Sequence, residues 1–308
     1  MKYLITGDFH IKEDRITEVE NILSQIAKKT QSTKGIIILG DVFNHPRPTT
    51  LEIDCLLQFL NQIKGKKVYI LGGNHDLDNK VFATKWVKKL PYNAKVFESL
   101  STTLTLENKK LYLGHHGVAE SVLGPEDYHL HKSSSYKNIQ ADAILLGHIH
   151  KSQIISTNPL VVHPGSPYFL NFGERNDKKG IGLLNIDNQS LTYSFEPLNV
   201  IKMIQLSIKE NELDSVIDKL EKIPADTKVK LIINITKINS DIALKIKNIE
   251  KIYKKKFTLF KVEKIKNIET IHCKNKDLNS IKELLNNFCK DNKVSKAIKK
   301  KLEKIVLL

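Results

Sequence analysis

Several residue types are scarce in this sequence, and each scarcity excludes a class of protein. The 308 residues include only three cysteines, Cys55, Cys273 and Cys289, which are far apart and form no CxxC pair. A disulfide-bonded scaffold and a zinc knuckle are therefore excluded. No apolar run approaches the roughly 20 residues that span a bilayer. We expect no signal peptide, because the first six residues lead directly into a glycine and polar residues. The expectation is a reduced, cytoplasmic protein with no membrane partner.

Arginine is also scarce, so the basic character of the chain comes from lysine. The chain has 49 basic and 34 acidic residues, a net charge of +15, and its only arginines are Arg15, Arg47 and Arg175. Residues 199–308 contain 26 lysines and 14 acidic residues, a net charge of +12, whereas residues 1–198 carry +3. A basic field attracts nucleic acid. Codon bias in an AT-rich genome would also enrich lysine, so charge alone leaves both explanations open.

The chain does contain the alternating elements of an α/β protein. With 41% hydrophobic residues it can bury a core, which excludes disorder. Apolar runs and helical periodicity predict strands at Lys2–Thr6, 35–39 and Lys67–Leu71 and helices at 16–26, 51–63 and 81–90, the second capped by Thr49 or Thr50. Later strands are expected at 95–98, 102–106, 110–114, 142–146, 159–163, 180–186 and 191–196. This pattern predicts a layered α/β domain that ends near Pro197.

The pattern changes after Pro197. Strands predicted at 200–208, Lys228–Ile235 and 257–262 alternate with helices predicted at 211–223 and 240–255. This order indicates a small βαβαβ unit. Two further segments, 277–289 and 293–306, have the spacing of amphipathic helices.

Histidines and acidic residues gather where predicted strands end. Ten of the eleven histidines precede residue 164, and the strand ends read GDFH at 7–10, GDVFNH at 40–45, GGNHD at 72–76, GHH at 114–116 and GHIH at 147–150. The carboxyl ends of strands face the crevice of an open α/β sheet, so we expect these residues to converge. A single such histidine could simply form a local hydrogen bond. Five motifs in this order are hard to explain in that way.

The residue types suit a pair of metal ions. The D-x-H and H-x-H spacings place both side chains on one side of an extended strand, so that both can reach one metal. Asp41 is a short carboxylate able to bridge two cations, and Asn74 supplies a neutral oxygen beside the histidine nitrogens. Mixed nitrogen and oxygen ligands without thiolate suit manganese, iron or zinc. Two metals about 3.5–4 Å apart can clamp a phosphate, activate a water and stabilise a leaving oxygen.

The order D-x-H, GD-x-F, GNHD, GHH and GH-x-H resembles the calcineurin-like metallophosphoesterase superfamily. Within that superfamily, residues 1–198 are similar to the SbcD-type (meiotic-recombination-eleven) DNA-repair nuclease subunits. The narrower resemblance is carried by these strings: Gly40-Asp41-Val42-Phe43 with Arg47-Pro48, Gly117-Val118, Gly147-His148-Ile149-His150-Lys151, Val162-His163-Pro164-Gly165-Ser166, and Asn171-Phe172-Gly173-Glu174.

The resemblance implies an α/β fold of four layers, with two β-sheets flanked by helices, and a two-metal site. One metal would be held by Asp8, His10 and His150 and the other by Asn74, His115 and His148, with Asp41 shared. The alternative to His115 is His116. His75 would bind no metal but would protonate the leaving 3′ oxygen or stabilise the transition state as an acid. Asp76 would orient the His75 imidazole.

The resemblance also suggests residues that contact the substrate. The family often carries a second histidine directly after GD-x-F, and here Asn44 takes that place, with His45 next to it. Either His45 substitutes, or exonuclease activity is weaker than endonuclease activity. Arg47, and Gly165 with Ser166 in the turn after His163, are further candidates for contact with DNA phosphates.

The implied organisation has three parts. Residues 1–198 would form the phosphoesterase (nuclease) domain, and residues 199–265 a small α+β capping domain whose lysines contact DNA phosphates. Residues 266–308 would form a C-terminal helical segment that docks an SMC-like ABC-type ATPase of the SbcC type. The alternative is that these helices only pack on the cap. A homodimer is expected, with contacts from the helices at 51–63 or 81–90.

The sequence therefore predicts a DNA exonuclease or endonuclease that uses two Mn²⁺ ions, or Mg²⁺, Fe²⁺ or Zn²⁺ in their place. It would be the nuclease subunit of an SbcCD-type repair and recombination complex, in the nucleoid of a cell or in the host cytoplasm of a virus. One alternative is a small-molecule or cyclic-nucleotide phosphoesterase on the same scaffold. The other, of a different class, is a non-catalytic DNA-binding scaffold subunit.

Overall fold

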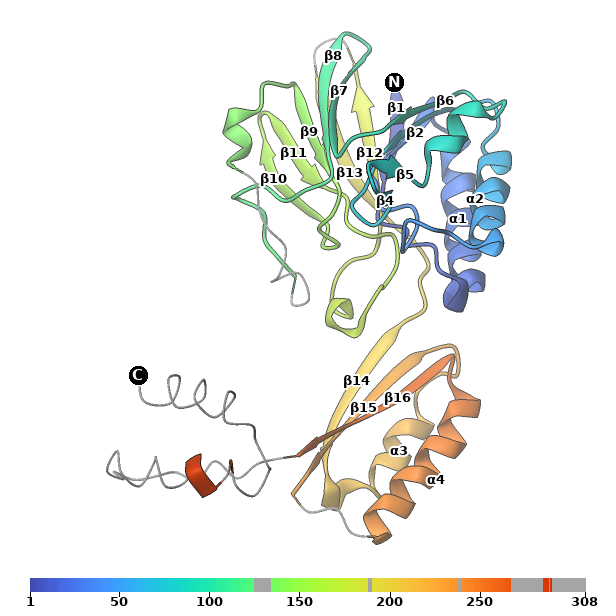
Figure 1. Cartoon of the computed structure of the whole chain (residues 1–308), viewed down its shortest axis with the longest axis vertical. Helices are drawn as coiled ribbons and strands as arrows, with labels where there is room; N and C mark the ends of the chain where they lie inside the picture. Colours follow the sequence, from blue (N-terminus) through green and yellow to red (C-terminus); the bar gives the residue numbers. More distant parts are fainter. Residues whose placement is uncertain (125–133, 188–189, 237–239, 267–284, 288, 290–308) are drawn as a thin grey trace.

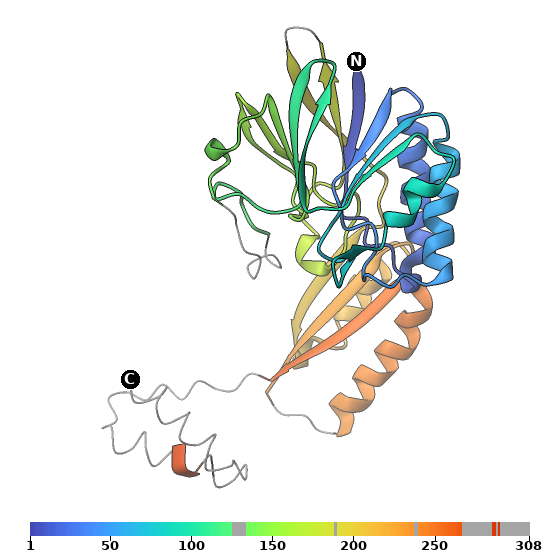
Figure 2. The ribbon, with the colours of Figure 1, turned by 45° about the horizontal axis from the view of Figure 1, so that its top comes forward.

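The computed structural model describes residues 1–124, 134–187, 190–236, 240–266, 285–287 and 289. The strands and helices before residue 198 form one body, and the elements after it form a second, smaller one (Figures 1 and 2). The helix predicted at 293–306 lies outside the described residues, as do most of the helix predicted at 277–289 and the residues His129 and His131.

A six-stranded sheet runs through the first body. Its strand order is β13-β12-β1-β2-β3-β6. The strands are β1 (Lys2–Thr6), β2 (Gly35–Ile38), β3 (Lys67–Leu71), β6 (Ala94–Phe97), β12 (Gly180–Ile186) and β13 (Leu191–Pro197). The strands β1, β2, β3 and β6 are parallel, so their carboxyl ends lie at one edge. The strands predicted at Lys2–Thr6 and Lys67–Leu71 are confirmed.

Two helices cover one face of this sheet. They are α1 (Ile16–Thr30), preceded by the 3-10 turn η1 (Glu13–Arg15), and α2 (Thr50–Gln62). The apolar stripe predicted for the first helix is buried against the sheet at Val19, Ile22, Leu23 and Ile26. Thr49 caps α2, because its side chain accepts the N–H of Glu52 while the Glu52 carboxylate accepts the N–H of Thr49. The choice between Thr49 and Thr50 is thereby decided.

A five-stranded sheet packs on the opposite face. Its order is β10-β11-β9-β8-β7, with β7 (Ser101–Leu106), β8 (Lys109–Gly114), β9 (Ala143–Leu146), β10 (Gln153–Thr157) and β11 (Leu160–His163). Apolar side chains of both sheets, such as Ile5 and Ile37 from one and Leu113 and Leu145 from the other, are fully buried between them. The 3-10 turn η3 (Tyr136–Asn138) packs on the outer face. Two sheets flanked by helices are what the resemblance implied.

The helix predicted at 81–90 is wrong. The chain instead forms a hairpin of β4 (Leu77–Asp78) and β5 (Val81–Phe82), followed by the 3-10 turn η2 (Lys85–Lys89). Asn79 and Lys80 have φ of 45° and 68°, the left-handed pair that a two-residue hairpin loop requires. The N–H of Ala83 donates to the carbonyl of Asp76 at 2.7 Å, so pairing with the preceding segment replaces the helical hydrogen bonds.

The second body is the predicted βαβαβ unit. Its three parallel strands are β14 (Met203–Lys209), β15 (Lys228–Ile235) and β16 (Leu259–Lys266), in that order. Helices α3 (Val216–Glu221) and α4 (Ser240–Lys256) pack on one face over a separate apolar core, and the 3-10 turn η5 (Glu210–Glu212) precedes α3. The predicted helix 211–223 is therefore shorter than expected, and the last strand begins two residues later.

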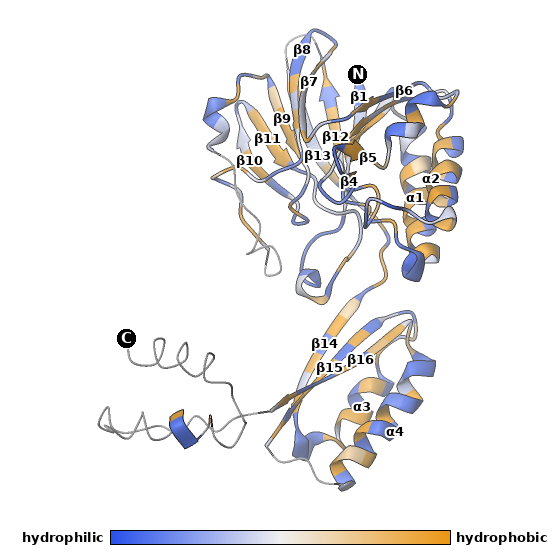
Figure 3. Ribbon diagram, viewed as in Figure 1, coloured by the Kyte–Doolittle hydropathy of each residue, from blue (hydrophilic) through white to orange (hydrophobic). Residues whose placement is uncertain are grey.

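The surface helices contain both polar and apolar residues. In Figure 3, α1, α2 and α4 carry both colours, whereas β9 and β11 are mostly apolar. Among the described helices, none combines the length and apolar character needed to cross a bilayer.

Candidate metal centre

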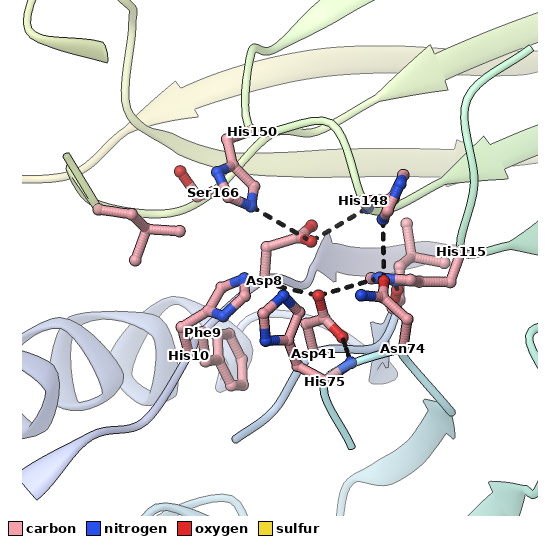
Figure 4. A network of polar contacts seen from close by, with 12 residues as sticks. Asp8, Phe9, His10, Asp41, Asn74, His75, His115, His148, His150 and Ser166 are labelled. Atoms are coloured by element: carbon pink, nitrogen blue, oxygen red, sulfur yellow. Dashed lines mark hydrogen bonds and ion pairs between the residues drawn. The ribbon is translucent and has the colours of Figure 1, made fainter. Parts of the chain in front are cut away.

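The strand-end motifs of both sheets meet at one place. Side chains that follow β1, β2 and β3 of the six-stranded sheet face side chains that follow β8 and β9 of the five-stranded sheet (Figure 4). The 3-10 turn η4 (Phe172–Glu174) borders this place, with Glu174 Oε1 3.0 Å from His150 Nδ1. The convergence expected from the sequence is therefore present.

The first group consists of Asp8, His10 and His150. One potential ligand atom of each residue lies within 4.8 Å of those of the other two. The Nε2 atom of His150 is 4.0 Å from Asp8 Oδ1, and the rings of His10 and His150 have centroids 5.2 Å apart. These three side chains are those that the resemblance implied for one metal.

The second group consists of Asp41, His115 and His148, with Asn74 between the two imidazoles. Asn74 Oδ1 is 3.1 Å from His115 Nε2 and 2.9 Å from His148 Nδ1. Asp41 Oδ2 is 3.1 Å from His115 Nε2 and 3.5 Å from His10 Nε2. Asp41 therefore lies between the two groups, where a shared ligand would have to be.

His115, and not His116, belongs to this cluster. His115 is buried, and its Nδ1 donates to the carbonyl of Leu39 at 2.6 Å, which directs Nε2 towards Asp41. His116 points elsewhere, with its Nε2 2.9 Å from the hydroxyl of Tyr112. The structure thus agrees with the preferred choice from the sequence.

The backbone is strained at this cluster. Asp8, His10, Asp41 and His148 have φ of 52°, 44°, 47° and 77°, a region that side chains with a Cβ rarely adopt. Gly40 has φ of 92°, and a Cβ there would lie 2.5 Å from His115 Nδ1. Such strain persists where the surrounding structure enforces it, and it concentrates at functional sites.

Burial and neighbouring charges set the ionisation of the cluster. Burial raises the pKa of Asp8 to about 6 and lowers the pKa of His10 to about 3 and of His148 to about 4. Burial opposes ionisation of both Asp41 and His115, but their mutual attraction outweighs it, lowering the pKa of Asp41 and raising that of His115 to about 9. These shifts favour the neutral, metal-binding form of His10 and His148, whereas His115 would release a proton when a metal binds.

Two buried polar atoms in this cluster make no hydrogen bond to the described residues. They are Asp8 Oδ2 and His10 Nε2. Buried polar atoms without partners are costly, and each commonly signals an ion or a water that completes the site. The donor set and these two atoms together fit divalent metal ions.

His75 is placed differently from the buried histidines. Its side chain is exposed, its ring centroid lies 4.7 Å from that of His10, and its Nδ1 donates to the carbonyl of Asn44 at 3.0 Å. Its backbone N–H donates to Asp41 Oδ1 at 2.8 Å. A ligand atom of His75 also lies within 4.8 Å of those of His10 and Asp41. His75 therefore lies at the open side of the cluster, beside both groups.

The role expected of Asp76 is wrong. Its carboxylate does not contact His75 but accepts the backbone N–H groups of Val42, Phe43 and Gly73 at 3.2, 2.9 and 3.2 Å. Asp76 is fully buried, and burial raises its pKa to about 7. These hydrogen bonds link the loop after β2 to the loop after β3, whereas His75 Nδ1 meets the backbone carbonyl of Asn44.

The residues expected to contact DNA divide into two kinds. Arg47 is exposed and pairs with Asp78 at 2.9 Å, and His45 is half-buried, with its Nε2 atom 3.5 Å from Glu52 Oε2. Gly165 and Ser166 are buried, and the Ser166 hydroxyl donates to the carbonyl of Tyr168. Contact of either residue with a DNA phosphate stays a prediction.

Glu174 and Lys179 are two further residues of this site, and the sequence patterns predicted no role for them. Glu174 is 4% exposed and accepts a hydrogen bond from His150 Nδ1 at 3.0 Å, and Lys179 pairs with it at 2.7 Å. Burial opposes ionisation of Glu174, but His150 and Lys179 prevail and lower its pKa to about 2. Glu174 ends one of the strings that carry the family resemblance, which was the only signal available.

The class of protein follows from a comparison with known families. The calcineurin-like phosphoesterase superfamily domain matches residues 1–189, a range that contains the whole cluster together with Glu174 and Lys179. The chain belongs to the calcineurin-like phosphoesterase superfamily. It is accordingly a phosphoesterase domain with a site suited to divalent metal ions.

The chain is similar to particular members of known function. It is 24% identical over 285 residues to the SbcD subunit of nuclease SbcCD from Staphylococcus saprophyticus, covering 72% of this chain and 75% of that protein. It is 38% identical over 82 residues to the SbcD subunit of nuclease SbcCD from Escherichia coli K12, covering 27% and 20%. A hypothetical protein of Pyrococcus horikoshii OT3 aligns with 72% of this chain and 94% of its own, at 13% identity and a TM-score of 0.41. The resemblance to SbcD-type subunits therefore holds at modest identity.

Proposed function

We propose that the protein is a DNA nuclease that uses two divalent metal ions, with manganese as the physiological pair. The observation that carries the proposal is the position of Asp41 between two groups of ligand-type side chains, with the exposed imidazole of His75 beside both. At this position Asp41 would be shared by two cations, and the accessible imidazole of His75 would protonate a leaving oxygen.

Each residue has a defined task in this proposal. Asp8, His10 and His150 would hold one ion, and Asn74, His115 and His148 the other, with Asp41 shared. Such a pair of ions clamps a phosphate and activates a water. His75 would donate a proton to the leaving 3′ oxygen, with its Nδ1–H bonded to the carbonyl of Asn44 and its other nitrogen towards the substrate. Asp76 would act only through the backbone that it holds.

The substrate and partners are inferred from the relatives and from charge. The similar proteins are named as subunits of SbcCD nucleases, so DNA is the substrate we propose. Residues 1–198 would form the nuclease domain, and residues 199–265 a basic cap that contacts DNA phosphates. Residues 266–308 would dock an SbcC-like ATPase. Exposed Arg47, with Asn44 and His45, would contact the DNA near His75. The proposal includes a homodimer that acts in the cytoplasm.

A cleavage assay on the purified chain tests this function. Linear, hairpin-ended and nicked DNA should be degraded with MnCl₂ and remain intact with EDTA. Hydrolysis of p-nitrophenyl phosphate or cyclic nucleotides without any cleavage of DNA would favour a small-molecule phosphoesterase. Binding of DNA without hydrolysis of any ester would favour a scaffold subunit. Removal of residues 270–308 should abolish co-purification with the ATPase and leave manganese binding intact.

A further inference from the structure

The two groups of ligand-type side chains differ in what their histidines bond to on the side away from the cluster centre. In the first group, the Nδ1–H of His150 donates to a carboxylate, Glu174 Oε1, at 3.0 Å. In the second group, the Nδ1–H of His115 donates to a neutral backbone carbonyl, that of Leu39, at 2.6 Å. A carboxylate behind a histidine fixes its tautomer and makes its other nitrogen a stronger ligand than a carbonyl does.

Glu174 is itself held rigidly. Its Oε1 accepts the side-chain N–H of Asn171 at 2.8 Å, and its Oε2 accepts the N–H of Leu170 at 3.1 Å. Lys179 Nζ lies 2.7 Å from Oε2 and also donates to the Ser166 hydroxyl and to the carbonyl of His150, at 2.6 and 3.1 Å. Both side chains of the pair are at most 5% exposed. Lys179 thus neutralises Glu174 and fixes the backbone of His150 at the same time.

The two groups also differ in charge. Asp8 belongs to the first group alone, whereas the corresponding oxygen ligand of the second group is the neutral amide of Asn74. Asp41 is common to both. A divalent cation therefore meets more negative charge, and a better-oriented imidazole, at Asp8, His10 and His150.

We propose that Glu174, held by Lys179, is a positioning residue that makes the Asp8–His10–His150 site the tighter of the two. The first cation then binds there, and the second binds at Asp41, Asn74, His115 and His148 only after it. This inference rests on the proposed two-metal function. The order in which the two metal sites fill would be set by Glu174 and Lys179, a buried ion pair that is not among the proposed metal ligands.

Manganese titration of the full chain, by calorimetry and by electron paramagnetic resonance, tests this order. Wild type should bind a tight ion and then a weaker one, the signal of an isolated ion changing to that of a coupled pair with the second. Glu174→Gln should weaken the tight step by about 10–100-fold and leave the weaker step nearly unchanged. Equal steps in wild type, or an unchanged tight step in the variant, would overturn the proposal.

Two further variants separate positioning from loss of stability. Glu174→Gln combined with Lys179→Gln removes both buried charges, and it should still weaken the tight step. Glu18→Gln breaks a different buried pair, Glu18 with Lys228, whose side chains are 8% exposed, and it should lower the melting temperature without altering either step. Weakening of the tight step by Glu18→Gln would overturn the proposal. A wild-type chain that binds no manganese would instead defeat the proposed function itself.

Discussion

The two bodies of this protein differ in their buried polar residues and in their backbone strain. Before residue 198, the buried polar side chains include Asp8, Asp41, Asp76, His115 and Glu174. Every described non-glycine residue with positive φ lies before residue 149. Between residues 203 and 266, the described buried polar residues are Thr227 and Lys228. Both bodies have parallel strands over apolar cores. Four of the positive-φ residues, Asn79, Lys80, Glu107 and Asn108, lie in hairpin turns. Folding alone does not require the strain at Asp8, His10, Asp41 and His148 or the buried charge beside it, and these mark the chemistry of the first body.

The largest expected effect comes from removing one imidazole of the first body. His75→Gln should lower DNA cleavage in manganese by about 10²–10⁴-fold, because a positioned proton donor contributes a factor of that size. Manganese titration should stay as in wild type, since His75 is not among the proposed ligands. Rates measured on a labelled hairpin substrate give the comparison.

A neighbouring histidine provides the control for that experiment. His116 lies next to His115 but bonds to Tyr112, away from the cluster. We expect His116→Gln to cleave DNA within a few-fold of the wild-type rate. An unchanged rate in His75→Gln would contradict the role assigned to that imidazole.

The second largest effect is expected in the second body, where substitutions should weaken DNA binding without lowering the rate of ester hydrolysis. Lys251, Lys254 and Lys255 are exposed on α4. Replacing all three by glutamine should weaken DNA binding and reduce its salt dependence, by about one unit of slope for each phosphate that the variant no longer neutralises. Hydrolysis of p-nitrophenyl phosphate should not change. Binding measured by fluorescence anisotropy at several salt concentrations gives the slope.

A matched triple variant in the first body tests whether position matters. Lys28, Lys64 and Lys67 are also exposed, and their replacement removes the same charge. If both triple variants reduce the slope equally, DNA is attracted by net charge alone, and the distinction between the two bodies fails for DNA binding.

The smallest effect concerns stability. His163 is fully buried and bonded to Ser121, and burial lowers its pKa from 6.5 to about 3. His163 takes up a proton below about pH 6.5 in the unfolded chain, but only below about pH 3 in the folded chain. Stability present above pH 6.5 is therefore lost on acidification, by about 1.4 kcal/mol per pH unit for this group. Urea unfolding of wild type and His163→Gln from pH 7 to 4.5 measures it, and equal pH slopes would contradict the assignment.

The sequence predicted what local patterns determine. Strand ends followed by Asp8, Asp41 and His148 were visible because apolar runs stop at glycine and ligand-type residues, and parallel strands bring such ends together. The alternation after Pro197 was equally visible, because its helices and strands have distinct periods.

Features that depend on tertiary contacts were not predictable. Nothing near Asp76 in the sequence shows that its carboxylate meets the backbone of Val42 and Phe43, more than thirty residues earlier. The segment at 81–90 has helical spacing, but the hairpin with Leu77–Asp78 overrides it. Glu174 reaches His150 through the 3-10 turn η4, which lies more than twenty residues further along the chain.

The most direct test of the account is the stoichiometry of manganese in the purified chain, measured on the same sample that is assayed for DNA cleavage. We expect two ions per chain, and cleavage that is lost with EDTA and restored when both ions are returned. Full DNA cleavage by a chain that holds a single ion, or none, would contradict it.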